Sequence, residues 1–208
     1  MYQPAAFAVT DPAEIEAVLA RLRLGCLITH DADGFCATHA PFLYEPERRV
    51  LTAHIARANP HWERAGSTRA LAVFQGADAY VSPSWYPSKR QHAKVVPTWN
   101  YEAAHVHGQL TWRHEAEWLR AQVGALSDRH EAPRAQPWAV SDAPKDYVQA
   151  MLRGIVGLEL TIEKVEVNRK LSQNRPEADR EGVIAGLSAS DAETDRQMAA
   201  IMRGLAKP

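Results

Sequence analysis

Residues 155–165, IVGLELTIEKV, alternate apolar and polar side chains with a period of two. Such alternation is typical of a β-strand with one face on a core and the other toward solvent. Antiparallel sheets allow this arrangement, whereas parallel sheets are buried on both faces and produce continuous apolar runs. The segment therefore predicts a half-buried antiparallel strand. Its apolar positions are Val156, Leu158, Leu160 and Ile162.

Further short strand-like runs precede this segment. GCLITH and FCATHA flank the turn sequence Asp31-Ala32-Asp33-Gly34, which predicts a hairpin because Asp-Gly tolerates the backbone of a tight turn. The other runs are VLTAHI, RALAVFQG, AYVS and AHVHGQLTW. Only short helices interrupt the series and regular βαβ alternation is absent, so the pattern favours a mainly β protein with helices, of the α+β class, built as a barrel.

Helix signals occur at both ends and in the middle of the chain. Asp11-Pro12-Ala13-Glu14 predicts a helix start, with a capping carboxylate, a proline in the first turn and a glutamate that reaches back. We expect further helices near residues 115–129 and 144–153. PEADREGVIAGL and the capping box Ser190-Asp191-Ala192-Glu193 predict two short helices at the end.

Composition excludes several classes of protein. The 208 residues are 46% hydrophobic and 24% charged, which is typical of a globular chain. A net charge of -1 provides no global attraction for nucleic acid or anionic membrane. The chain has no membrane-length apolar run and no signal-peptide pattern, so we expect a cytoplasmic protein. Cys26 and Cys36 have no CxxC spacing, and we expect two buried thiols.

The common catalytic and nucleotide-binding motifs are missing from the sequence. It contains no GxGxxG, no GxxxxGK[ST] and no GxSxG-like elbow. His105 and His107 would point to the same face of a strand, but no HExxH helix or paired CxxC supplies further zinc ligands. We therefore predict no metal site, and interpret these histidines as structural or as lining a cofactor.

Three segments predict a flat anionic ligand when they are taken together. LTAHIARANPHWE, residues 51–63, runs as a strand into Arg57, with Asn59 and Pro60 at a helix start, an arrangement suited to an anion. An ordinary strand-to-helix junction with a solvent-facing arginine fits this spacing equally well. KLSQNRP, residues 170–176, is a second donor-rich loop. The irregular stretch 82–100 carries three prolines, two tryptophans and a tyrosine, and long loops of this kind are usually functional.

Seven segments in one order resemble the signature blocks of the PaiB-like FMN-binding negative transcriptional regulators. They are MYQPAAF, ATHAP, HIARANPHW, YVSPSWYPSK, VPTWNYEAAHVHG, IVGLEL and KLSQNRP, and they extend over nearly the whole chain. The resemblance implies a split β-barrel related to flavin reductases and pyridoxamine-phosphate oxidases. It also implies a homodimer with FMN at the interface.

The resemblance also implies a set of cofactor-binding residues. Thr38 and His39 would border the isoalloxazine ring, and His54, Ala56, Arg57 and Asn59 would hold the phosphate side. The remaining contacts would come from Trp99, Asn100, Tyr101, Lys170 and Gln173. Hydrophobic anchoring of a long loop is the alternative interpretation of Trp99 and Tyr101.

The expected organisation is a barrel domain over residues 1–175 with a helical segment, residues 176–208, packed on it. Three functions stay open at this stage: an FMN-sensing repressor, an FMN-dependent oxidoreductase or flavin reductase acting on a small molecule, and a dimeric binding module. Direct DNA binding is disfavoured, because the second C-terminal helix begins among Asp191, Glu193 and Asp195, and carboxylates repel phosphates. A small-molecule signal or a protein partner would then mediate any regulation.

Overall fold

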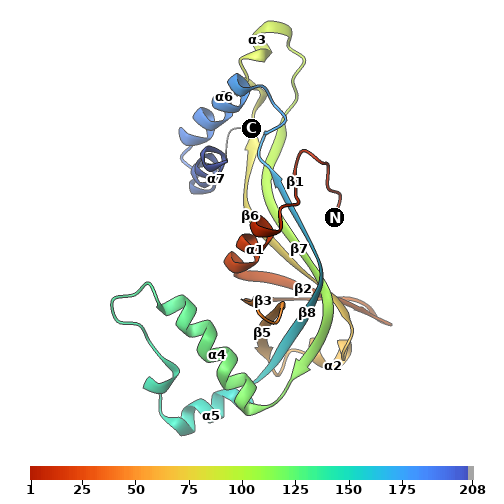
Figure 1. Ribbon diagram of the computed structural model, residues 1–208, viewed down its shortest axis with the longest axis vertical. Helices are drawn as coiled ribbons and strands as arrows, with labels where there is room; N and C mark the ends of the chain where they lie inside the picture. The colour runs from red at the N-terminus through yellow and green to blue at the C-terminus, as the bar shows by residue number, and fades with distance from the viewer. Residues whose placement is uncertain (206–208) are drawn as a thin grey trace. The chain divides into compact units, whose positions relative to one another are not determined.

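The computed structural model describes residues 1–205 and contains eight strands and seven α-helices over that range (Figure 1). The strands are β1 (Ala8–Val9), β2 (Leu24–Asp31), β3 (Gly34–Pro41), β4 (Leu43–Glu45), β5 (Val50–Ala56), β6 (Arg69–Val81), β7 (Thr98–Arg113) and β8 (Ile155–Lys170). The helices are α1 (Pro12–Arg21), α2 (His61–Ala65), α3 (Ser88–His92), α4 (Ala116–Glu131), α5 (Lys145–Arg153), α6 (Glu177–Ser188) and α7 (Glu193–Gly204), with 3-10 turns η1 (Pro83–Trp85) and η2 (Val140–Asp142).

The strands form one antiparallel sheet in the order β3-β2-β6-β7-β8-β5-β4, and β1 pairs with β8. β3 also contacts β5, so the sheet curls round on itself. This confirms the predicted α+β split barrel. The chain divides into two compact units, and β6, β7 and β8 contribute residues to both.

Unit 2, residues 12–74 and 105–165, holds the hairpin that the sequence predicts. Asp31 pairs with Gly34 across the turn, and Gly34 has a φ of 109°, a backbone conformation that favours glycine. Leu27, Leu51 and Leu158 are fully buried in this unit. The predicted helix after Asp11 is confirmed as α1.

Helices α4 and α5 of unit 2 confirm the predictions near residues 115–129 and 144–153. Leu119, Val148 and Leu152 form the apolar cluster between them. α4 packs on β5, and Trp118 lies so close to Gly157 that a Cβ there would come within 2.2 Å of the indole. The glycine thus gives the helix room to approach the sheet.

The predicted solvent face of β8 is wrong at Glu159, which is only 5% exposed. Its carboxylate is paired with Arg48 at 2.6 Å and with Arg113 at 3.0 Å. Burial disfavours its charged form, but the two guanidinium groups outweigh that effect and lower the pKa of Glu159. The polar side chain is therefore buried because two partners accompany it.

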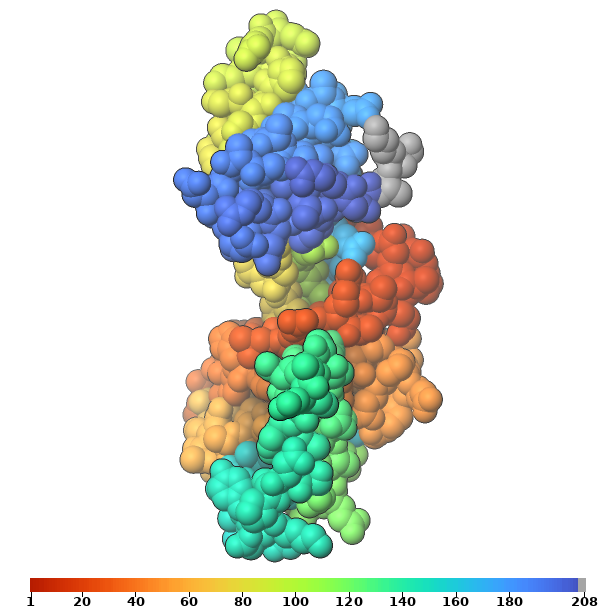
Figure 2. Space-filling view, turned by 90° about the vertical axis from the view of Figure 1, so that its left-hand side faces the viewer, coloured from red at the N-terminus to blue at the C-terminus, as the bar shows by residue number. Residues whose placement is uncertain are grey.

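Unit 1 combines residues 1–11, 75–104 and those from Glu166 onward. Its core packs α6 and α7, which confirm the two predicted C-terminal helices, against η1. Figure 2 shows α6 and α7 side by side in blue. Gly182 and Gly186 face Trp85, whose backbone oxygen would lie 2.0 Å from a Cβ at Gly182. The tight approach of η1 to α6 depends on these glycines.

Two boundaries differ from the sequence prediction. β6 is one strand of 13 residues where two runs, RALAVFQG and AYVS, were expected, and the stretch 82–100 contains η1, α3 and the start of β7. The predicted division after residue 175 falls just before α6 and stays a prediction. No helix within residues 1–205 combines the length and hydropathy that a membrane crossing requires.

Candidate functional site

Arg57, at the end of β5, is held by three hydrogen bonds to a single segment of unit 2. Its backbone N–H donates to the Gly154 carbonyl at 2.8 Å. In its side chain, Nε donates to the carbonyl of Arg153 and Nη2 to that of Ile155, both at 2.9 Å. Neutral carbonyl partners fix the guanidinium without neutralising its charge, so Arg57 is a rigid cation.

The indole of Trp62 also holds the Arg57 region in place. Trp62 Nε1 donates to the Arg57 carbonyl at 2.8 Å, and the guanidinium lies 5.9 Å from the centre of the indole ring. A cation over an aromatic face is attracted by the ring quadrupole. Sequence spacing leaves open a mobile, solvent-facing Arg57, and the structure shows an ordered side chain instead.

Asn59 lies just before the helix that follows, but the N-cap is Pro60 and not Asn59, so the predicted cap is wrong by one residue. The Oδ1 of Asn59 accepts from the N–H of His61 at 3.0 Å, and its Nδ2 donates to Thr38 Oγ1 on β3 at 3.1 Å. The structure therefore brings Thr38 and Asn59 together. α2 itself has only five residues, so its dipole is small and Arg57 is the main attraction for an anion in this corner.

His61 is fully buried beneath this corner, and the prediction of site residues missed it. Its Nδ1 lies 2.8 Å from Thr38 Oγ1 and its Nε2 lies 2.8 Å from Thr29 Oγ1. Burial lowers the pKa of His61, and nearby Arg64 lowers it further. A neutral imidazole donates at one nitrogen and accepts at the other, so His61 and two threonines lock β2, β3 and α2 together.

His54 on β5 is oriented by a residue of α4. Its Nδ1 lies 2.8 Å from Oε1 of Gln122, an amide oxygen that accepts, so Nδ1 carries the proton. Nε2 is then a hydrogen-bond acceptor. Gln122 is 5% exposed and lies 68 residues from His54, so no local sequence signal reveals this pair.

The remaining predicted residues of unit 2 differ in exposure. His39 is exposed on β3, and Ala56 is exposed at the end of β5. Neither side chain is buried in the barrel core, so both stay accessible to a ligand of this unit.

In unit 1, the predicted aromatic segment begins β7. Trp99 is 53% exposed and meets Tyr80 of β6 edge to face, with ring centres 6.0 Å apart. Tyr101 is half-buried. Exposed aromatic rings of this kind are suited to packing against a flat ligand.

Asn100 points the other way, into the helical core of unit 1. It is fully buried, its Oδ1 accepts from Ser172 Oγ at 3.0 Å, and its Nδ2 lies 3.3 Å from Met202 Sδ. In this structure Asn100 thus ties β7 to the loop after β8 and to α7.

Lys170 and Gln173 are also occupied by partners within unit 1. Lys170 Nζ donates to Thr98 Oγ1 at 2.6 Å. Gln173 accepts from the Leu171 N–H at 2.7 Å and donates to the Arg169 carbonyl, around Ser172, whose φ is 60°. Gln173 therefore stabilises the turn in which Ser172 adopts a left-handed backbone.

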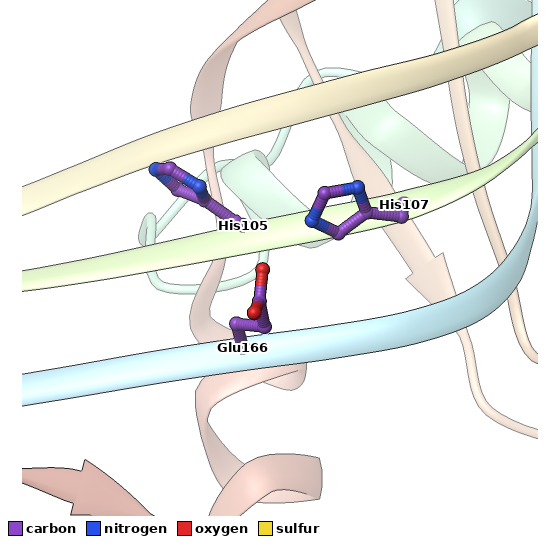
Figure 3. Close-up of side chains that lie close together, drawn as sticks. All are labelled: His105, His107 and Glu166. Atoms are coloured by element: carbon purple, nitrogen blue, oxygen red, sulfur yellow. The ribbon is translucent and has the colours of Figure 1, made fainter. Parts of the chain in front are cut away.

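The histidine pair lies on β7, within unit 2. His105 and His107 are half-buried, with ring centres 6.5 Å apart. Figure 3 shows both imidazoles on this strand, and also Glu166 of β8, which belongs to unit 1.

Each unit, taken by itself, offers groups that fit one part of FMN. The cofactor carries a phosphate, a ribityl chain and a planar ring. Unit 2 offers the fixed guanidinium of Arg57 and the side chains of Asn59 and His54, whereas unit 1 offers the exposed rings of Tyr80 and Trp99. The chemistry is a cation for the phosphate, polar groups for the ribityl chain and aromatic surface for the ring.

Comparison with known families decides the classification. Residues 1–164 match the family model described as "Putative FMN-binding domain". The chain belongs to this FMN-binding family. One relative is the protease synthase and sporulation protein PAI 2 of Bacillus subtilis. It is 32% identical to this chain over 205 residues, and the alignment covers 97% of this chain and 96% of that protein. The resemblance to PaiB-like proteins is thereby confirmed.

Solved structures share the fold of this FMN-binding family member. A conserved hypothetical protein of Mycobacterium tuberculosis aligns with a TM-score of 0.58 at 16% identity, over 85% of this chain and 95% of the other. The flavocytochrome Anf3 of Azotobacter vinelandii aligns with a TM-score of 0.55 at 12% identity, over 78% and 68%. At these identities the likeness concerns the fold alone.

Proposed function

We propose that this protein is a homodimeric FMN-binding flavoprotein that acts as a negative transcriptional regulator of the PaiB type, in the cytoplasm. The observation that carries the FMN site is the fixed guanidinium of Arg57, which two backbone carbonyls of one segment hold without neutralising its charge. An ordered cation binds a phosphate at a lower entropic cost than a mobile one.

Within this proposal, the phosphate side of FMN is held by Arg57 together with His54, Ala56 and Asn59. Thr38 and His39 border the ring. Support comes from the hydrogen bond between Thr38 and Asn59. The oriented imidazole of His54 offers Nε2 as an acceptor, which suits a ribityl hydroxyl next to the phosphate. The proposed contacts from unit 1 are Trp99, Asn100, Tyr101, Lys170 and Gln173, of which Trp99 is the most exposed.

A homodimer is supported by a hollow of about 290 Å³ on the sheet of unit 2, whose exposed surface is mostly apolar although the ion pair Arg69–Glu163 belongs to its lining. Ile28, Leu71 and Phe35 line it, and Phe35 is 79% exposed on β3. Contiguous exposed apolar surface of this kind marks interaction sites. A second copy of the chain is the partner that we propose.

Regulation through the flavin, a small-molecule signal or a protein partner fits the surface charges better than direct contact with DNA. The first turn of α7 carries Glu193 and Asp195, which would repel phosphates. We expect no competitor-resistant shift of upstream DNA in a mobility-shift assay at about 150 mM salt, a concentration that weakens nonspecific binding. Nanomolar, competitor-resistant binding would instead restore direct repression.

The flavin part of the proposal is tested by titrating the apoprotein with FMN. We expect saturable quenching of flavin fluorescence and a shifted visible spectrum, because a bound isoalloxazine ring changes its surroundings from water to protein. The purified protein as isolated should also carry the absorbance of a flavin. A wild-type protein that binds no FMN in this titration would refute the proposed function.

A further inference from the structure

A pocket of about 330 Å³ lies beside Arg57, entirely within unit 2. It is formed where the end of β5 meets the start of α4 and the end of α5. Its lining residues are Arg57, His114, Ala116, Leu119, Gln149, Leu152 and Arg153. Apart from Arg57, the resemblance to PaiB-like proteins assigns none of them to the cofactor.

The charge of the lining is one-sided. Arg57 and Arg153 contribute two permanent positive charges, and His114 and Gln149 add further polar groups. No carboxylate belongs to the lining. The carboxylate of Glu115, next in sequence to His114, accepts from the His114 backbone N–H at 3.1 Å. This lining favours an anion.

The guanidinium of Arg57 is fixed at the pocket through Nε and Nη2, which leaves Nη1 for a ligand. Nε and Nη2 donate to the carbonyls of Arg153 and Ile155, and no hydrogen bond joins Nη1 to another group of residues 1–205. Nη1 carries two N–H donors. A phosphate oxygen is the acceptor that such an edge binds most strongly.

Two more features of the pocket suit a phosphate group. Leu119 and Leu152 are 2% and 8% exposed and give it an apolar floor, where charge-assisted hydrogen bonds are stronger than in water. Ala116 is the first residue of α4, a helix of 16 residues, and the N-terminal end of a helix carries a partial positive charge.

We infer that this pocket receives the terminal phosphate of FMN, and that Arg153, Gln149 and His114 are specificity-determining residues for FMN over riboflavin. The inference rests on the proposed function and deepens it. The phosphate is the ionised group that distinguishes FMN from riboflavin. The side chains that line the pocket therefore contribute to the binding of FMN and not to that of riboflavin.

The test is to titrate wild-type protein and the variants Arg153→Ala, Gln149→Ala and Lys145→Ala with FMN and, separately, with riboflavin. Arg153→Ala should weaken FMN binding about 10- to 100-fold, the loss typical of a charge-assisted hydrogen bond, and should leave riboflavin binding within about twofold. Gln149→Ala should show a smaller loss of the same kind. Lys145, an exposed cation on the same helix outside the pocket, is the matched control and should change neither affinity.

The other outcomes of these titrations distinguish a failure of the pocket assignment from a failure of the proposed function. If wild-type protein binds FMN but Arg153→Ala binds it equally well, the pocket assignment is overturned while the proposed function stands. Equal losses for FMN and riboflavin would also overturn it, because they indicate general damage. Wild-type protein that binds neither flavin refutes the proposed function, and the pocket assignment with it. Circular dichroism confirms that each variant is folded.

Discussion

Arg57 owes its position to backbone carbonyls and not to carboxylates. A surface arginine paired with Asp or Glu would be largely neutralised, whereas the carbonyl partners of Arg57 leave its full charge available. One of these bonds satisfies the carbonyl of Arg153, the last residue of α5, which lacks a partner within the helix. Arg57 thus has a structural role and a proposed binding role, and its substitution must be read with both in mind.

His61 should make stability depend on pH in the mildly acidic range. Burial lowers its pKa below the ordinary value of 6.5, so the unfolded chain takes up the proton first as pH falls. The contribution of the neutral His61 to the free energy of unfolding is therefore complete above about pH 6.5 and is lost as the pH falls below that value. For one proton this loss is at most about 1.4 kcal/mol per pH unit.

Denaturant unfolding of wild-type protein and His61→Gln between pH 7.5 and 5 checks this dependence. The difference between their free energies of unfolding should shrink toward lower pH, since glutamine does not titrate in this range. If the free energy of unfolding changed with pH equally in wild-type protein and His61→Gln, burial of His61 would not oppose its protonation.

At the scale of elements, the sequence predicted the turns and helices that depend on residues close together in the chain. The turn at Asp31–Gly34 and the start of α1 lie where the turn and capping residues place them. The two C-terminal helices also form, but α7 begins after Ala192 without a side-chain cap, so the predicted capping box does not set its start. The site corner was predicted only in part. Arg57 and Asn59 lie in one strand-to-helix segment, whereas Gln122 is 68 residues from His54 and Arg153 is 96 residues from Arg57. Glu159 is buried beside Arg48, in the turn between β4 and β5, and Arg113 of β7.

The approach of η1 to α6 should not tolerate a methyl group at Gly182. A Cβ there would lie 2.0 Å from the backbone oxygen of Trp85, and backbone moves less easily than a side-chain end. We expect Gly182→Ala to lower the free energy of unfolding by about 1–3 kcal/mol, the usual cost of overpacking.

Gly124→Ala is the matched control for that substitution. Gly124 lies within α4, and a Cβ there meets nothing within 4 Å. Because alanine favours helix over glycine by about 1 kcal/mol, this variant should be as stable as wild-type protein or more so. Thermal or urea unfolding compares the two, and a Gly182→Ala protein as stable as Gly124→Ala would contradict the packing account.

At the scale of the whole molecule, the proposed dimer should appear in solution. Light scattering at micromolar concentration should give twice the monomer mass of 23.1 kDa. Phe35→Asp should shift the mass toward the monomer, because it places a charge in the mostly apolar hollow on the sheet. Tyr147→Asp is the control, since Tyr147 is 56% exposed on α5 and does not line the hollow. A wild-type mass near 23.1 kDa would contradict the dimer.

The central claim is that a fixed Arg57 holds the phosphate of FMN, and the FMN affinity of Arg57→Ala measures it most directly. The account predicts that this variant binds FMN more weakly by about 1.5–3 kcal/mol, the worth of a charge-assisted hydrogen bond, while its riboflavin affinity stays near that of wild-type protein. Arg23→Ala, which removes an exposed arginine of the same unit, should bind FMN normally. An Arg57→Ala protein that is folded by circular dichroism and binds FMN as tightly as wild-type protein would contradict the claim and move the phosphate elsewhere.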